Sequence, residues 1–228
     1  YDLNEDIKIY ATAAKGYRVG GVNQPVPLDA GTGCRAEVQS LGLTAAPTSF
    51  ESDVIWNYEL GANTTWADGR VQINAAIFHI DWEDIQTRRQ LGCGFTFFTN
   101  SAEADVDGFE LDIQAQVTDS LYLSTAIGYN KGELSKDDLF LGALKGDDMP
   151  GVSDFTASAT ARYDFTMLGK DTFVRADYTY ASEFDSLFTA GGTNPANREA
   201  GGFSVVNLRA RMDIQENWSV TIYANNIN

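Results

Sequence analysis

His79 is the only histidine of the chain, and Asp81 follows it two residues later. Residues two apart in an extended strand share a face, so the imidazole and the carboxylate form a conceivable catalytic pair, as in membrane-embedded hydrolases. A general base must reach the proton that it removes, and the sequence places no nucleophile beside this pair. We therefore expect no catalytic residue and no enzymatic activity, and interpret His79 as a histidine of an interface or a lumen.

The segment TRRQLGCGFTFFTN indicates ligand binding. Arg88 and Arg89 carry forked guanidinium groups that can engage an anionic ligand, while Phe95, Phe97 and Phe98 offer an apolar wall. Arg88, Arg89, Phe95 and Phe97 are accordingly the candidate ligand-binding residues. The alternative, which we favour, is that Phe97 and Phe98 begin the next strand and belong to its interfacial belt.

Cys34 and Cys93 are the two cysteines of the chain. In an exported protein, two cysteines more often form a disulfide than a metal site, because the compartment is oxidising and structural zinc sites usually need four ligands. A Cys34–Cys93 disulfide is therefore expected, with free or variably paired cysteines as the alternative.

Two acidic pairs, Asp137 with Asp138 and Asp147 with Asp148, carry oxygen ligands of the kind that Ca²⁺ prefers. Neither has the spacing of an EF-hand loop, so we interpret them as solvated loop charges and expect no metal site. The glycine pairs in GYRVGG and AGGTNPANREAGG lack phosphate-loop spacing. No cofactor is expected.

The elements that must position these residues are β-strands, because apolar and polar residues alternate along most of the chain. Leu111, Ile113 and Ala115, for example, fall on one face, and Asp112 and Gln114 on the other. In residues 71–86 apolar side chains occur on both parities, which leaves the outward face of this strand open. The nine predicted strands cover residues 7–18, 56–66, 71–86, 109–117, 121–130, 155–165, 173–180, 203–214 and 218–225.

The connections between these strands are unequal in a regular way. Tight breaks at residues 67–70, 118–120, 167–170 and 215–217 recur at intervals of about fifty residues. The other connections are long. They cover roughly residues 19–55, 87–103, 133–151 and 182–201. Short turns at one end and long loops at the other are typical of outer-membrane β-barrels.

The apolar faces favour a membrane barrel over a soluble β-sandwich. They include small residues such as Ala157, Ala159 and Ala161, which lipid tolerates but which would leave voids in a close-packed core. Aromatic residues gather near the strand ends, as in the interfacial girdles of such barrels. The fold class expected is all-β, an antiparallel transmembrane β-barrel.

Composition excludes several other classes. No run approaches the roughly eighteen apolar residues of a transmembrane helix, and no signal peptide is recognisable, so either a removed segment directed export or the chain is an internal piece. With 32 acidic and 16 basic residues the net charge is −16, which argues against nucleic acid as a partner.

Several segments carry a family resemblance: IYATAAKGYRVGGVN, NYELGANTTWADGRVQINAAIFHIDWEDIQ, DGFELDIQAQVTDSLYLSTAIGYNKGEL, GDDMPGVSDFTASATARYDF and GGFSVVNLRARMDIQENWSVTIYANNIN. They resemble the carboxy-terminal half of the barrel of TonB-dependent outer-membrane receptors. The resemblance implies that residues 1–228 supply about nine strands of a 22-stranded barrel, and that the plug domain and the remaining strands lie outside this chain.

The resemblance also implies a function and partners. We expect a receptor in the outer membrane of a Gram-negative bacterium that captures a scarce nutrient from outside, a ferric siderophore before another large solute, and therefore a small-molecule or metal-chelate ligand. The TonB complex would energise transport through the plug, while lipid and lipopolysaccharide would surround the barrel. The alternative is a passive porin-like or adhesin-like barrel.

Overall fold

The computed structural model describes residues 1–227 except those at positions 30, 32, 139 and 193. Its elements are β1 (Ile7–Arg18), β2 (Gly21–Val22), α1 (Cys34–Ser40), β3 (Ser49–Phe50), β4 (Asp53–Trp66), β5 (Val71–Gln90), β6 (Thr96–Gln116), β7 (Leu121–Leu134), β8 (Phe155–Met167), β9 (Lys170–Ala181), β10 (Phe184–Asp185), β11 (Glu199–Ala200), β12 (Phe203–Gln215) and β13 (Trp218–Ala224). No helix in this described part combines the length and the apolar character needed to cross a membrane.

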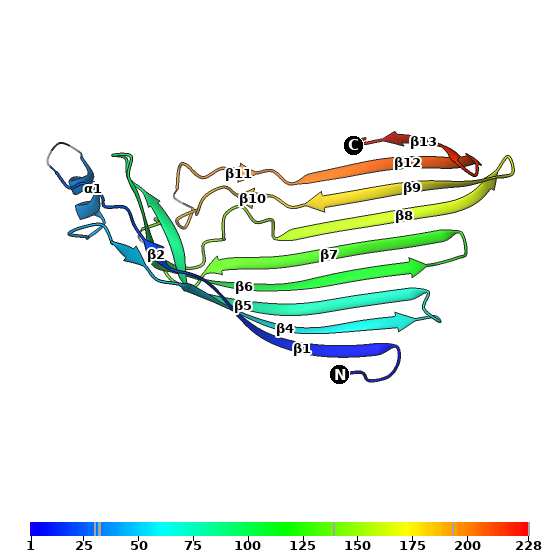
Figure 1. Ribbon diagram of the computed structural model, residues 1–228, viewed down its shortest axis with the longest axis horizontal. Coiled ribbons are helices and arrows are strands. Elements are labelled where there is room, and N and C mark those ends of the chain that lie inside the picture. Colours follow the sequence, from blue (N-terminus) through cyan, green and yellow to red (C-terminus); the bar gives the residue numbers. More distant parts are fainter. Residues whose placement is uncertain (30, 32, 139, 193, 228) are drawn as a thin grey trace.

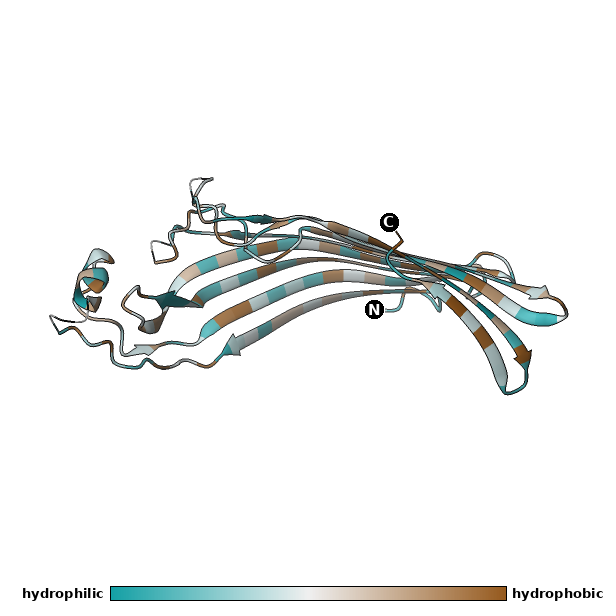
Figure 2. Cartoon of the chain, turned by 90° about the horizontal axis from the view of Figure 1, so that it is seen from above, coloured by the Kyte–Doolittle hydropathy of each residue, from teal (hydrophilic) through white to brown (hydrophobic). Residues whose placement is uncertain are grey.

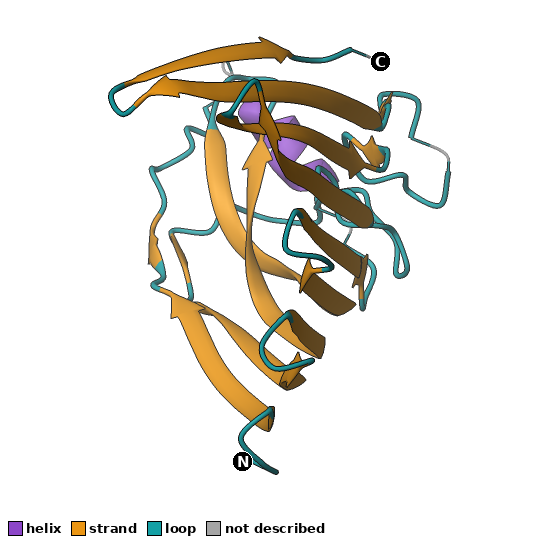
Figure 3. Cartoon of the chain, turned by 90° about the vertical axis from the view of Figure 1, so that its right-hand side faces the viewer, coloured by secondary structure: helices purple, strands orange, loops and turns teal. Residues whose placement is uncertain are grey.

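Nine of the strands form one antiparallel sheet in the order β1-β4-β5-β6-β7-β8-β9-β12-β13. Figure 1 shows them side by side, with tight turns at one end and long connections, α1 and the two-stranded ribbons at the other. The sheet follows an open arc in Figure 3, with the amino terminus at one extreme and the carboxy terminus at the other. The predicted all-β barrel sheet of nine strands is confirmed.

Strand register separates an outer from an inner face of the sheet. Leu60 of β4 lies opposite Ile77 of β5, which lies opposite Phe109 of β6, and directly opposed residues share a face. Leu60 and Ile77 are 55% and 59% exposed, far too much apolar surface for contact with water across a whole sheet. We call this lipid-facing side the outer face. The residue-by-residue alternation is visible as colour bands in Figure 2.

The register also settles which face of β5 points outward. Ile73 and Ile77 oppose Ile113 and Phe109 on the outer face, whereas Phe78 belongs to the inner face, the other side of the sheet. A Cβ atom on Gly108 would lie only 2.2 Å from the ring of Phe78. Both parities of β5 are therefore apolar for different reasons, one for lipid and the other for packing inside.

The inner face is otherwise mainly polar. Tyr10 of β1 donates a hydrogen bond of 2.7 Å to Glu59 of β4, and its ring lies against Gly61, where a Cβ atom would come within 2.4 Å of it. Further along the sheet, Arg175 of β9 donates to Asp177 at 2.7 Å. The sheet thus has a polar inner face opposite its apolar outer face, as in a barrel that surrounds a polar lumen.

One predicted connection is wrong. The sequence predicts a long loop over residues 87–103, but β5 and β6 continue as a paired hairpin to Gln90 and Thr96. Alternation is lost there because a β-bulge between Trp82 and Ile85 shifts the register, with Asp84 at φ 52°. The hairpin extends beyond its neighbouring strands and bends away from the sheet in Figure 1.

Candidate functional site

The long connections between strands lie together at one end of the sheet, which we call the mouth (Figure 1). Val38 of α1 packs against Leu91 and Phe97 at the tip of the β5–β6 hairpin, and all three side chains are buried. These three residues form the helix cluster. Cys34, at the start of α1, is joined to Cys93 in the hairpin tip, with 2.05 Å between their Sγ atoms and 5.4 Å between their Cα atoms. The segment that contains α1 is thereby fixed to the hairpin.

A second apolar cluster lies where β5, β6 and β7 meet the later connections. The inner cluster consists of the buried residues Ile85, Ala102, Ala104, Leu134 and Ala143. Leu141, Met149 and Phe188 pack against it, so the β7–β8 and β9–β12 connections both lie on the inner side of the sheet. Their apolar side chains cover the inner cluster.

Asp147 ties these two connections together. Its carboxylate accepts hydrogen bonds from the backbone N–H groups of Leu144 at 2.9 Å, Ala190 at 2.8 Å and Gly191 at 2.9 Å, and from the hydroxyl of Thr189 at 2.7 Å. Burial of the carboxyl acts to raise its pKa, but these donors favour the charged form, so the pKa of Asp147 lies below its ordinary value. Ionised Asp147 thus stabilises the mouth.

The expectation that the acidic pairs are solvated loop charges is wrong for Asp138 and Asp147. Asp138 is 1% exposed, and its carboxylate accepts hydrogen bonds from Ser101 at 2.6 Å and from the N–H of Phe140 at 2.8 Å. Asp147 is 5% exposed. Both carboxylates satisfy backbone donors that loop folding removes from water, a common role for buried acidic residues. Asp137 is exposed, as expected.

The structure separates the two candidate arginines. Arg88 lies opposite Phe98 and Arg89 opposite Phe97 across the hairpin, so the guanidinium groups point to opposite faces. Arg88 is exposed, whereas Arg89 donates a hydrogen bond of 2.7 Å to the carbonyl oxygen of Phe140. The two side chains therefore do not form a joint anion clamp.

The candidate phenylalanines are separated as well. Phe95 is 37% exposed at the hairpin tip, but Phe97 is fully buried in the helix cluster. Phe97 does begin the next strand, since β6 starts at Thr96, but the interfacial-belt interpretation is wrong for it, because Val38 of α1 packs against its side chain. Phe98 instead packs against Phe50 with 5.2 Å between the ring centroids. Of the predicted ligand-binding residues, Arg88 and Phe95 remain accessible at the mouth.

Sequence reasoning missed a network at the rim that joins three strands. Asp53, at the start of β4, is 1% exposed and forms an ion pair with Arg18 of β1. It also accepts a hydrogen bond of 3.1 Å from the indole N–H of Trp82 in β5, whose ring lies under the Arg18 guanidinium at 5.1 Å. Only the register brings these residues together, so no local signal identifies them.

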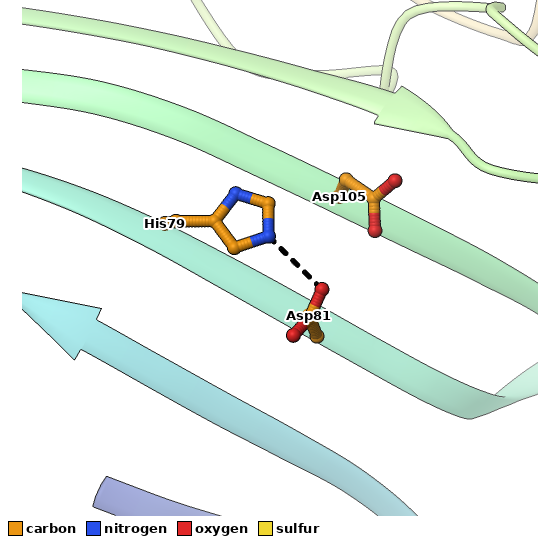
Figure 4. Close-up of side chains that lie close together, drawn as sticks. All are labelled: His79, Asp81 and Asp105. Carbon is orange, nitrogen blue, oxygen red and sulfur yellow. Dashed lines mark hydrogen bonds and ion pairs between the residues drawn. The ribbon is translucent and has the colours of Figure 1, made fainter. Parts of the chain in front are cut away.

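His79 lies on the outer face, in register with Asp107 of β6. Its Nδ1 atom is 2.7 Å from Asp107 and its Nε2 atom 3.0 Å from Asp81. The neighbouring β6 residue Asp105 lies opposite Asp81. Figure 4 shows His79, Asp81 and Asp105 gathered over the two strands. The histidine is thus surrounded by carboxylates on the outward side of the sheet, not in the lumen.

Comparison with known proteins agrees with this architecture. The family profile for the TonB dependent receptor-like β-barrel matches residues 1–227. The metal-pseudopaline receptor CntO of Pseudomonas aeruginosa is 22% identical over 230 residues, covering 100% of this chain and 28% of that protein. The probable TonB-dependent siderophore receptor PiuA of Acinetobacter baumannii is 30% identical over 128 residues, covering 56% of this chain and 15% of that protein.

Solved structures show the same fold. The ferric yersiniabactin uptake receptor FyuA of Yersinia pestis matches with a TM-score of 0.74 at 20% identity, covering 100% of this chain and 30% of that chain. The siderophore receptor PiuA of Acinetobacter baumannii matches with a TM-score of 0.68 at 22% identity. The chain thus spans less than a third of the length of these relatives. Since the profile covers nearly every residue and the nine-stranded sheet has the same fold, the chain belongs to the family of TonB-dependent receptor β-barrels.

Proposed function

We propose that residues 1–228 are the carboxy-terminal part of the barrel of an outer-membrane receptor that imports a ferric siderophore, in a Gram-negative bacterium. Membership in the receptor family carries this proposal, and the names of the relatives, a siderophore receptor and a metal-pseudopaline receptor among them, favour a metal chelate as the scarce nutrient. The plug domain, the remaining strands and the contact with the TonB complex belong to the complete receptor.

The faces of the sheet suit such a receptor. The outer face presents apolar side chains to membrane lipid and lipopolysaccharide, while the inner face, with pairs such as Tyr10–Glu59 and Arg175–Asp177, provides a polar wall for a plugged lumen. At the mouth, Arg88 supplies a positive charge for an anionic chelate and Phe95 an apolar contact. Arg89 has a different proposed role, since its bond to Phe140 positions the β7–β8 connection beside the hairpin.

Transport tests this proposal directly. A strain that lacks the complete receptor gene should lose uptake of one ⁵⁵Fe-labelled siderophore from a panel, and the restored gene should recover it only when the TonB complex is present. Uptake that persists without the TonB complex, together with a steady conductance in planar bilayers, would favour the passive porin-like alternative. Normal uptake with lost surface attachment would favour the adhesin-like alternative.

Point variants of the complete receptor test the ligand contact. Arg88→Ala should weaken siderophore binding about tenfold to a hundredfold, because one charge-assisted hydrogen bond of roughly 1.5–3 kcal/mol is lost. Arg70→Ala is the matched control, since this arginine lies at the opposite end of the barrel. Its guanidinium group pairs there with the carboxylate of Asp119 at a distance of 3.3 Å. Equal binding by both variants would remove Arg88 from the proposed contact surface.

A further inference from the structure

One histidine and three aspartates, residue types that can ligate a metal, converge on the outer face from two adjacent strands. β5 contributes His79 and Asp81, and β6 contributes Asp105 and Asp107 directly opposite them. One ligand atom from each of His79, Asp81 and Asp105 lies within 4.8 Å of the other two. In Figure 4 the imidazole and the carboxylates of Asp81 and Asp105 are gathered over the two strands, with Nε2 of His79 directed at Asp81.

The charge of this group is unbalanced. Three carboxylates surround one imidazole, and carboxylates on directly opposed positions such as Asp81 and Asp105 repel each other. The nearest cation by register is Lys131 of β7, opposite Asp107. Its ammonium group, however, lies 2.6 Å from Asp148 and 3.3 Å from Asp154, and is engaged there. The group therefore has an excess of negative charge that a bound cation would neutralise.

The location allows a cation to enter. The next outward-facing pair toward the tight turns is Ile77 with Phe109, and Phe109 stacks on Tyr129 at 5.9 Å, as in an interfacial aromatic girdle. His79 is the ninth residue of β5, and about nine residues are what a tilted strand needs to cross the hydrocarbon. The group thus lies where the outer face leaves the lipid. The His79 and Asp81 side chains are 43% and 41% exposed.

We propose that His79, Asp81 and Asp105 bind one divalent transition-metal cation, with Asp107 as a positioning residue. A carboxylate that holds one ring nitrogen of a histidine while the other binds metal is a recurrent arrangement, and Asp107 lies 2.7 Å from Nδ1 while Nε2 faces the other two carboxylates. The imidazole favours Zn²⁺ and similar ions over Mg²⁺ and Ca²⁺. This inference departs from the sequence-based expectation of no metal site, because only strand register brings Asp105 and Asp107 to His79.

The distances between the ligand atoms suit such an ion after small side-chain movements. Ligands about 2.0–2.2 Å from a tetrahedral Zn²⁺ lie about 3.3 Å from one another. The separation of Nε2 from Asp81 is already 3.0 Å, so rotation of the half-buried Asp105 side chain closes the site. The fourth position stays open to water or to an anionic group from the surrounding envelope.

The bound ion would join β5 to β6 immediately before the bulge at Asp84. Beyond that bulge the hairpin leaves the sheet and carries Arg88 and Cys93 into the mouth. Metal binding at the outer face should therefore slow backbone hydrogen exchange in the hairpin without any contact between the metal and the mouth.

The experiment uses the complete receptor, purified in detergent, stripped with EDTA and titrated with ZnCl₂ by isothermal calorimetry. We expect the wild type to bind Zn²⁺ saturably. His79→Asn and Asp105→Asn should each weaken this binding at least tenfold, and Asp107→Asn should weaken it roughly 10- to 100-fold. Asp119→Asn is the control, because the Asp119 carboxylate is fully exposed in a turn. This variant should bind Zn²⁺ like the wild type.

Heat-modifiable gel migration identifies the variants that are folded, and only those are compared. Zn²⁺ binding that is equally tight in the wild type and in folded His79→Asn would overturn the proposal, as would the absence of saturable binding in the wild type. MgCl₂ provides a second arm, because Mg²⁺ binding that matches Zn²⁺ and is insensitive to His79→Asn would overturn the assigned role of the imidazole.

Discussion

The hydroxyl group of Thr189 donates a hydrogen bond of 2.7 Å to the carboxylate of Asp147, across 42 residues of sequence. This contact joins the β9–β12 connection to the β7–β8 connection. Asp147→Asn should weaken the docking of the two connections by about 1.5–3 kcal/mol, because the hydrogen bonds then lose a charged acceptor. Hydrogen exchange at the Gly191 amide should become about tenfold to a hundredfold faster.

Thr189→Ser is the control for this change, since it keeps the hydroxyl donor. Exchange at Gly191 that accelerates as much in Thr189→Ser as in Asp147→Asn would assign the effect to packing and not to the hydrogen bond.

Acid should open the same contact. The pKa of Asp147 is lower in the folded mouth than its ordinary value of 3.8, so its contribution to stability is complete above pH of about 3.8 and is lost as the pH falls through the lowered value. Hydrogen exchange or limited proteolysis of residues 182–201 between pH 7 and pH 2 measures this loss. In Asp147→Asn the pH dependence should be smaller, and an unchanged profile would assign it to other groups.

The facing of β6 predicts opposite outcomes for two adjacent residues. Ile113 lies on the outer face between Ile73 and Thr125, so Ile113→Arg should cost about 2–4 kcal/mol, as for a charge near the bilayer midplane. Gln114→Arg places its charge on the inner face beside Asp112 and should cost far less. Folding titrations of the complete barrel into lipid vesicles provide the comparison. Equal losses would contradict the assignment of the faces.

The division between tight turns and long connections predicts the orientation of the barrel. A peptide tag inserted beside Asn194, in the β9–β12 connection, should bind antibody on intact cells, whereas a tag at Asp119, in the β6–β7 turn, should do so only after the outer membrane is permeabilised. Both variants should be present at equal amounts on immunoblots. Labelling of the Asp119 tag on sealed cells would invert the orientation.

Reduction should release α1 from the hairpin. The Cys34–Cys93 pair closes a loop across a sequence separation of 59 residues, for which chain entropy sets an upper limit of about 4 kcal/mol. Since strand pairing already restrains this loop, we expect a smaller loss, confined to the segment around α1. Trypsin should cleave after Arg35 faster in Cys34→Ser/Cys93→Ser than in the wild type. Equal cleavage rates, with and without reductant, would show that the helix cluster alone holds α1.

The sheet could be predicted from the sequence because lipid on one side and a polar lumen on the other leave an alternating pattern in each strand. The alternation over residues 7–18 predicts a strand with the same bounds that β1 has in the structure. The pattern failed in β5, where Phe78 is apolar although it faces inward. Its ring packs over Gly108, which is 30 residues away in the sequence and is identified only by register.

The mouth was less predictable than the sheet. The local sequence predicts a solvated charge at Asp147, because its hydrogen-bond donors Thr189 and Gly191 lie more than forty residues away. The local sequence predicts that Phe97 belongs to an aromatic girdle, because no neighbouring residue in the sequence indicates that Val38 packs against it. Long connections fold by contacts between distant segments, and such contacts leave no periodic signal in the local sequence.

The packing of Tyr10 over Gly61 has a consequence for how the sequence can diverge. Any side chain at position 61 would collide with the phenol ring, so a substitution of Gly61 is tolerated only where Tyr10 has first been replaced by a smaller residue. The two positions should therefore covary among homologues, as should Gly108 with Phe78, while the outward-facing Leu60 next to Gly61 should drift freely among apolar residues. The inner wall of the barrel is thus expected to evolve in interlocked pairs and the lipid face one residue at a time.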